Sequence, residues 1–362
     1  MRIGILTSGG DCPGLNAVIR GFAKYVYNNI PRVEMIGISD GYGGLITGEA
    51  KNLKESDFSG ILNTGGTILG TSRQPFKMMT VEDQNGQSKL EMMKANYKKL
   101  DLDLLVTLGG AGTHKTAGLL SANGLNVIGL PKTIDNDIYG TDVTFGFHSA
   151  VEIATECIDR IHTTAASHGR TMLIEIMGNK VGWLTLYSGI AGGADIVLLP
   201  EIPYDKDEVC RMVRSRYNSG KDFTIIAIAE GAMSREEAKM KKNERIEAWG
   251  GRHTATESLA AYIQEHAEVE TRVVVPGHLQ RGGAPSPYDR LLSTEMGSFA
   301  GKLVQEECFG TTVAVKNNQI SYNKLADIAG KTKYVPEDDQ MIEVARSIGI
   351  SFGDGKKFKG LK

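Results

Sequence analysis

Short apolar runs followed by turn residues alternate with amphipathic stretches along most of the chain. Six runs have the length of a strand and are almost continuously apolar, namely Arg2–Thr7, Leu104–Leu108, Val127–Leu130, Thr171–Ile176, Phe223–Ala229 and Arg272–Val275. Helical spacing marks Asn16–Tyr27, Leu90–Leu100, Lys115–Leu120, Phe147–Ala165, Lys206–Tyr217, Thr254–His266 and Pro287–Gln305. Continuous apolar character is typical of parallel strands covered by helices on both faces. The alternation therefore predicts an α/β protein with mainly parallel sheets.

Length and charge narrow the possibilities further. The 362 residues are about twice the usual length of one compact domain, so we expect two lobes. A net charge of −2 gives no general attraction to nucleic acid or to an anionic membrane. No signal-peptide core and no run of 18 apolar residues occurs. The four cysteines are scattered without metal-ligand spacing, so the sequence indicates neither a zinc site nor a disulfide framework. These features predict a cytoplasmic protein.

Glycine is abundant, and it gathers where the apolar runs end. The chain has 44 glycines, well above the roughly 7% of an average protein. Ser8–Asn16 and Leu108–Thr113 each join an apolar run to a helical stretch, so backbone N–H groups there could bind an anion. A third glycine turn, Gly65–Arg73, ends in a guanidinium that could stabilise charge on a transferring phosphoryl group. Plain connections and a surface arginine are the competing interpretations.

The loop from Pro131 to Asp137 holds the densest chemistry in the sequence. Lys132, Thr133, Asp135 and Asp137 stand together just after an apolar run. One carboxylate could accept a proton while the other faces a metal ion or a dipole. A simple Asx-turn that closes the loop is the alternative interpretation.

Basic residues near glycine turns could bind a phosphate monoester. Arg170 precedes an apolar run, and Arg272, His278 and Arg281 follow in the segment 271–283. Arginine offers bidentate contacts to phosphate and histidine adds a donor. For His278 alone, a structural role is the competing interpretation.

Together these motifs resemble the phosphofructokinase family. The segments 9–16, 131–137, 177–178 and 277–283 occur in family order, and the likeness covers roughly residues 1–310. It is similar to the mixed-substrate (group III-like) bacterial branch of the family. The resemblance implies two Rossmann-like three-layer lobes with the site between them, and phosphoryl transfer from ATP to the 1-hydroxyl of fructose 6-phosphate. It also implies a homo-oligomer, dimer or tetramer, whose sites a neighbouring subunit completes.

The resemblance also implies roles for individual residues. Asp135 would be the general base, with Thr133 and Arg73 beside it as catalytic residues. The donor would contact Gly10, Arg73, Gln74, Gly110, Ala111, Gly112 and Thr113. The sugar phosphate would contact Thr133, Ile134, Asp135, Met177, Gly178, Asn179, Glu230, His278 and Arg281, with Arg170 and Arg272 supplied by the partner chain. Asn179 stands where many relatives have arginine, and His162 where effector-regulated relatives have arginine.

The implied lobes have discontinuous boundaries. Residues 1–146 with about 282–308 would form the phosphoryl-donor lobe. Residues 147–281 with about 309–362 would form the fructose 6-phosphate lobe.

Two positions bear on the metal and the donor. Most relatives have a carboxylate at the position of Ala111 that helps to organise Mg²⁺, so Asp137, the donor phosphates and water would have to bind the ion here. Gly112 leaves room for a nucleotide, as in relatives that use ATP, whereas Lys132 resembles those that use pyrophosphate. ATP is the favoured donor.

Two alternative functions stay open. A pyrophosphate-dependent phosphofructokinase rests on Lys132. A non-catalytic regulatory paralogue that only binds sugar phosphate rests on Ala111 alone, and a pure binding protein needs neither Asp135 nor Arg73. A nucleotide-binding dehydrogenase is excluded because the first turn is not GxGxxG.

Overall fold

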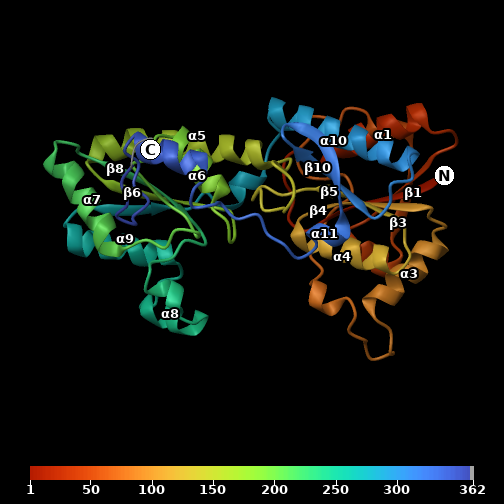
Figure 1. Ribbon diagram of the computed structural model, residues 1–362, viewed down its shortest axis with the longest axis horizontal. Coiled ribbons are helices and arrows are strands. Elements are labelled where there is room, and N and C mark those ends of the chain that lie inside the picture. The colour runs from red at the N-terminus through yellow and green to blue at the C-terminus, as the bar shows by residue number, and fades with distance from the viewer. Residues whose placement is uncertain (359–362) are drawn as a thin grey trace. The chain divides into compact units, whose positions relative to one another are not determined.

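The computed structural model describes residues 1–358 and forms two compact α/β units (Figure 1). Unit 1 consists of Met1–Ser149 and Arg281–Lys333. Unit 2 consists of Ala150–Gln280 and the chain from Tyr334 onward. Each unit has its own sheet and its own apolar core, so each is described separately.

The sheet of unit 1 has seven strands in the order β11-β10-β5-β4-β1-β2-β3. Their bounds are β1 Arg2–Ser8, β2 Glu34–Ile38, β3 Ala50–Leu53, β4 Leu104–Gly109, β5 Val127–Pro131, β10 Thr311–Lys316 and β11 Gln319–Lys324. The five inner strands are parallel, and the edge strands β3 and β11 are antiparallel. The carboxyl ends of β1, β4 and β5 therefore meet at one edge of the sheet, where α/β proteins bind ligands.

Helices cover both faces of this sheet (Figure 1). One face carries α1 (Leu15–Asn29) and α10 (Pro287–Gln305), and the other carries α3 (Lys89–Lys99), α4 (Ala111–Ala122) and α11 (Leu325–Ile328). A short α2 (Tyr42–Thr47) packs in the same core as α3 and α4, and η1 (Glu55–Phe58) and η2 (Phe76–Met78) are 3₁₀ turns. The close packing of α1 against α10 requires glycine, because a β-carbon at Gly297 would lie 2.4 Å from the Val18 oxygen.

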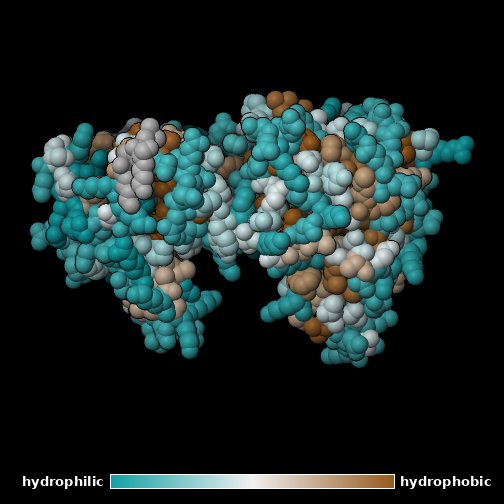
Figure 2. Space-filling model, in the orientation of Figure 1, coloured by the Kyte–Doolittle hydropathy of each residue, from teal (hydrophilic) through white to brown (hydrophobic). Residues whose placement is uncertain are grey.

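The sheet of unit 2 has four parallel strands in the order β7-β8-β6-β9. Their bounds are β6 Thr171–Ile176, β7 Ile196–Leu198, β8 Thr224–Ala229 and β9 Thr271–Val274. The helices of this part are α5 Phe147–His168, α6 Trp183–Ala191, α7 Lys206–Asn218, α8 Lys242–Ala248, α9 Ala255–Ala267 and α12 Gln340–Ser347, with 3₁₀ turns η3 Glu237–Lys239 and η4 Gly277–Arg281. The inner sides of α7 and α9 pack on β8, and hydrophilic residues cover the outer side of α7 (Figure 2).

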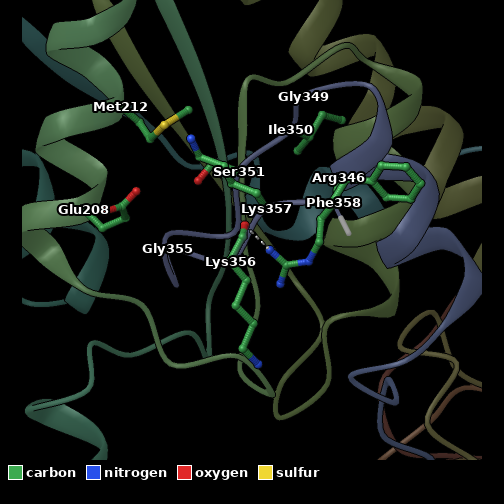
Figure 3. Close-up of a pocket in the computed structure, with 10 residues that line it drawn as sticks. All are labelled: Glu208, Met212, Arg346, Gly349, Ile350, Ser351, Gly355, Lys356, Lys357 and Phe358. Atoms are coloured by element: carbon green, nitrogen blue, oxygen red, sulfur yellow. Dashed lines mark hydrogen bonds between the residues drawn. The ribbon is translucent and has the colours of Figure 1, made fainter. Parts of the chain in front are cut away.

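The chain after α12 packs onto unit 2 and lines a cavity of about 350 Å³ (Figure 3). Ser351 forms a parallel bridge with Ile196 at the edge of the sheet. Arg346 binds both carboxylate oxygens of Asp354, at 3.0 and 2.7 Å, and donates to the Lys356 carbonyl at 2.9 Å. None of the residues that the sequence assigns to a site lines this cavity.

The structure confirms the predicted α/β class with mainly parallel sheets. All six predicted strands and all seven predicted helices are present, with ends that differ by a few residues. The expected second lobe is wrong for residues 309–333, which belong to unit 1 because β10 pairs with β5. Residues 147–149 and Arg281, also expected in the second lobe, belong to unit 1 as well. The expected second lobe also included residues 359–362, which lie outside the described residues. Within residues 1–358, no helix is long and apolar enough to cross a membrane.

Candidate active site

In unit 1, the glycine turn after β1 is bound to the segment that carries Arg73. The Gly9 N–H donates to the Ser72 oxygen at 3.0 Å, and the Thr71 hydroxyl donates to the Gly9 oxygen at 2.6 Å. Gly9 has a φ of +88°, a conformation that other residues adopt only with strain. Two predicted phosphate-type turns, far apart in the sequence, are thus joined.

Three cations meet at this turn. A β-carbon at Gly10 would lie 2.7 Å from Arg281 Nη1 and 3.4 Å from Arg73 Nη2. The Lys132 ammonium donates to the Gly10 oxygen, and its side chain is only 4% exposed. Burial lowers the pKa of Lys132. The absence of a side chain at Gly10 lets the two guanidinium groups approach the backbone, and their charges attract an anion such as a phosphoryl group.

The second turn begins α4 next to the first. The Thr113 hydroxyl donates to the Ser8 oxygen at 3.4 Å, and the Lys132 N–H donates to the Gly109 oxygen at 3.0 Å. A β-carbon at Gly112 would meet no atom within 4 Å, so the space beside it is open. Free N–H groups at the start of a helix favour a negative charge. The residues predicted to bind the donor are therefore close together, except that the Gln74 side-chain oxygen accepts from Lys89 at 2.7 Å.

A buried histidine supports the start of α4. His114 Nδ1 lies 3.0 Å from the Gly110 oxygen, and Nε2 lies 2.8 Å from Thr312 Oγ1. Burial lowers the pKa of His114 to about 4, so the ring is neutral at pH 7. Since a carbonyl only accepts, Nδ1 carries the proton and Nε2 accepts from Thr312. The ring thus fixes the orientation of the Gly110 carbonyl group.

The carboxylate loop follows β5. The Asp135 N–H donates to the Thr133 hydroxyl at 3.0 Å, and the Thr144 hydroxyl donates to the Thr133 oxygen at 2.8 Å. Asp135 is half-buried. Asp137 Oδ1 is buried without a hydrogen-bond partner among residues 1–358, and burial raises the pKa of this carboxyl. The loop is therefore held by hydrogen bonds of Thr133 and Thr144, and its two carboxylates are separated in the chain by Asn136 alone.

Within residues 1–358, no three His, Cys, Asp or Glu side chains form a group that could hold a metal ion. Ala111, at the first position of α4, adds no oxygen ligand. The unpartnered oxygen of Asp137 is the kind of ligand that Mg²⁺ prefers. One carboxylate with substrate phosphates and water is a common magnesium site, so these residues fit that pattern.

In unit 2, the predicted sugar-phosphate residues gather at the carboxyl ends of β6, β8 and β9. Glu230 Oε1 accepts from the Gly178 N–H at 3.2 Å and from the Asn179 N–H at 2.7 Å. Gln280 accepts from the Met177 N–H at 3.2 Å and donates to the Gly277 oxygen at 3.1 Å. The exposed His278 lies within the same 3₁₀ turn as Gln280. The sequence reasoning gave Gln280 no role, although it lies inside the motif that contains His278 and Arg281.

Glu230 also lines a cavity of about 340 Å³. The other walls come from the ends of β8 and α9 and from α8, with the side chains Lys242, Arg245 and Trp249. The charged helix α8, which follows β8 in the chain, is thus part of a wall beside a predicted substrate residue.

Arg170 and Arg272 lie near the amino ends of β6 and β9, at the opposite edge of the same sheet. Both bind one oxygen of Glu270, at 2.9 and 2.5 Å. The length of β6 separates Arg170 from Met177 by about 20 Å. One chain therefore does not bring these arginines to Met177 and Glu230. Glu270 was missed in the sequence because only the pairing of β6 with β9 places it beside Arg170.

Comparison with known proteins shows the family of the chain. The family model described as "Phosphofructokinase" matches residues 2–304. An "ATP-dependent 6-phosphofructokinase" of Spirochaeta thermophila is 56% identical over 97% of both chains. An "ATP-dependent 6-phosphofructokinase 3" of Bacteroides thetaiotaomicron is 46% identical over 98% of this chain and 100% of its own.

A solved phosphofructokinase structure has a similar fold. The crystal structure of Pichia pastoris phosphofructokinase in the T-state superposes with a TM-score of 0.77 and 32% identity, over 91% of this chain and 35% of that larger one. With motifs, fold and near full-length relatives in agreement, this chain belongs to the phosphofructokinase family.

Proposed function

We propose that this chain transfers the terminal phosphoryl group of ATP to the 1-hydroxyl of fructose 6-phosphate, giving fructose 1,6-bisphosphate and ADP in glycolysis. The observation that carries the proposal is the meeting of Arg73, Lys132 and Arg281 at the Gly10 turn. The names of the relatives at 56% and 46% identity support both ATP and the reaction.

Asp135 acts as the general base. Its carboxylate accepts the proton of the 1-hydroxyl as that oxygen attacks the phosphorus, and Asp135 as a residue is half-buried. The hydrogen bond from its N–H to Thr133 fixes the backbone of the base. Arg73 stabilises the negative charge on the transferring group, since phosphoryl transfer depends mainly on positioning and electrostatics.

The donor lies against the two glycine turns of unit 1. Gly10 and the segment from Gly110 through Ala111 to Thr113 offer backbone N–H groups to its phosphates, and the open space beside Gly112 accommodates the nucleotide. Gln74 lies next to Arg73 and completes this set.

Mg²⁺ accompanies the donor, with Asp137 as the ligand from the protein and with phosphates and water as the others. The ion neutralises charge on the phosphates when it is bound. This assignment rests on the unpartnered Asp137 oxygen.

Fructose 6-phosphate binds to residues of both units and of a second copy. One copy supplies Thr133, Ile134, Asp135, Met177, Gly178, Asn179, Glu230, His278 and Arg281. Arg170 and Arg272 come from the partner, because they lie at the far edge of the sheet of unit 2. The active form is therefore a homo-oligomer with shared sites. A cytoplasmic location accords with four free cysteines.

Pyrophosphate is the second candidate donor, because Lys132, the lysine that resembles pyrophosphate-using relatives, is buried at the Gly10 turn with Arg73 and Arg281. The Lys132 ammonium already donates to the Gly10 oxygen, which gives it a structural use with either donor. A non-catalytic regulatory protein is disfavoured by the joint presence of Asp135 and Arg73.

The test compares initial rates on fructose 6-phosphate and Mg²⁺ with ATP or pyrophosphate at matched concentrations. We expect turnover with ATP only. Asp135→Asn should lower kcat by about 10²–10⁴-fold, whereas Asp159→Asn, an exposed change of the same kind on α5, should leave it unchanged. Turnover with pyrophosphate alone would refute ATP as the donor. Full activity of Asp135→Asn would refute Asp135 as the general base. Sugar-phosphate binding by calorimetry without turnover would favour the regulatory protein.

A further inference from the structure

Lys333, the last residue of unit 1, reaches the loop that carries Asp135 from nearly 200 positions away in the chain. Its ammonium donates to Asn136 Oδ1, to the Thr141 oxygen and to the Asp142 oxygen, each at 2.9 Å. An ammonium has three N–H donors, and these three acceptors match that number. The Lys333 side chain thus links three points of one loop through hydrogen bonds.

The backbone of the same segment binds the loop as well. The Lys333 N–H donates to the Asp137 oxygen at 2.9 Å, and Thr332 forms an antiparallel bridge with Ile138. The segment therefore pairs with the loop like a short strand. Side chain and backbone together hold the loop at Asn136 and Asp137, immediately beyond Asp135.

Asn136 is the point at which these contacts converge. Its side chain is 4% exposed, and Oδ1 accepts from the Thr144 N–H at 3.1 Å as well as from Lys333. Its φ of +53° is a conformation that needs support from the surroundings. Since Asp135 directly precedes Asn136 in the chain, we expect a change at Asn136 to move the Asp135 carboxylate.

Charge adds to the geometry. Asp137 and Asp142, both on this loop, are the carboxylates whose fields act on the Lys333 ammonium. The cation therefore offsets negative charge on the loop as well as donating hydrogen bonds to it. An apolar side chain of similar length would supply neither effect.

We propose that Lys333 is a positioning residue that holds Asn136, and through it the Asp135 carboxylate, in the geometry required for phosphoryl transfer. This inference rests on the proposed function, because it acts through Asp135 as the base. A displacement of about 1 Å at a reacting group can cost about 10²-fold in rate. Nothing in the sequence marks Lys333, which lies outside every motif with a predicted role.

The first experiment measures kcat and both KM values for Lys333→Met, which keeps most of the stem but removes the ammonium. We expect kcat to fall by about 10–100-fold while the KM values for ATP and fructose 6-phosphate change less than about twofold. Lys333→Arg, which keeps the charge and the donors, should recover part of the loss. The matched control is Lys331→Met, since the Lys331 ammonium lies over the Tyr139 ring at 5.1 Å and should not affect kcat.

A double-mutant cycle separates positioning from a general loss of structure. In an Asp135→Asn background, Lys333→Met should have no further effect on the residual rate, because the group it positions is gone. Multiplicative losses in that background would overturn the proposal. Asn136→Ala should reproduce the kcat loss and be non-additive with Lys333→Met, and it keeps the test available if Lys333→Met does not fold.

The outcome also distinguishes this inference from the proposed function. If the unmodified chain shows no turnover with any donor, the proposed function fails and this inference fails with it. If the unmodified chain is active and folded Lys333→Met has the same kcat, only the positioning role is refuted.

Discussion

At the scale of single residues, a buried neutral histidine supports the donor turn, by which we mean the glycine turn Gly109–Thr113 at the start of α4. His114 has this role, because its neutral ring donates from Nδ1 to the Gly110 oxygen and accepts at Nε2 from Thr312. A protonated ring would present a second N–H to the Thr312 hydroxyl and a charge to the apolar interior. Folding is thus coupled to the neutral state of one imidazole.

This coupling predicts a loss of stability in mild acid. The pKa of His114 is about 4 in the folded chain and 6.5 as the ordinary value, so the unfolded chain binds more protons between these limits. The neutral His114 ring stabilises the folded chain fully above pH 6.5. As the pH falls toward 4, the free energy of unfolding drops by a few kcal/mol on this account. Urea unfolding between pH 7.5 and 5 measures it. The free energy of unfolding should depend less steeply on pH in His114→Gln than in the unmodified chain. Equal slopes would contradict the assignment of a neutral, buried His114.

At the scale of secondary-structure elements, the sequence predicted some but not all of the buried strands, because β2, β7 and β10 are largely buried and were not predicted. β1, β4, β5 and β8 are continuous apolar runs, and each was found. Elements at the edge of a sheet carry a weaker pattern. β3 has two exposed residues among four, and β11 is mostly exposed or half-buried, so neither was predicted. Residues 309–333 were placed in the wrong lobe because the partner of β10 depends on strand order, which periodicity does not reveal.

The candidate site shows the same division between local and distant contacts. Short motifs identified the glycine turns and the Thr133–Asp137 loop, because the chemistry-bearing residues of each stand close together in the sequence. The contacts of Glu270 and Lys333 depend on which segments pair in three dimensions. Spacing in the sequence cannot supply that information, so these residues emerged only from the structure.

The donor turn at the start of α4 yields a prediction for Gly112. In Gly112→Asp the new β-carbon meets no atom within 4 Å, and a carboxylate in the first turn of a helix is favourable, so Tm should be unchanged or slightly higher. The carboxylate would occupy the space proposed for the nucleotide and repel its phosphates. We expect kcat/KM for ATP to fall by about 10-fold or more. Gly112→Ala is the control, and an Asp variant with normal ATP kinetics would show that the nucleotide lies elsewhere.

At the scale of the whole molecule, the two edges of the sheet of unit 2 have different proposed partners. Met177 and Glu230 lie at the carboxyl edge, whereas Arg170 and Arg272 lie at the amino edge with Glu270. A shared site is the arrangement in which both sets reach one sugar phosphate. Complementation between two inactive variants tests it.

We expect Asp135→Asn and Arg272→Ala to be inactive separately and to regain activity when they are dissociated, mixed and reassembled. An intact site then combines Asp135 of one copy with Arg272 of the other. For random dimers, about a quarter of the wild-type rate should return. No recovery, with mixed oligomers demonstrated by mass, would show that each chain builds its own site.

The discontinuous make-up of unit 1 has a consequence for biosynthesis. The ribosome delivers β5 early, but β10, which covers its edge, follows only after all of Ala150–Gln280 has been translated. During that interval the nascent chain exposes one unpaired parallel edge strand, a surface prone to wrong pairing. Unit 2 likewise waits for Ser351 to bridge Ile196. Both sheets are therefore completed only by segments that are translated after Gln280, namely β10 in unit 1 and the segment that contains Ser351 in unit 2.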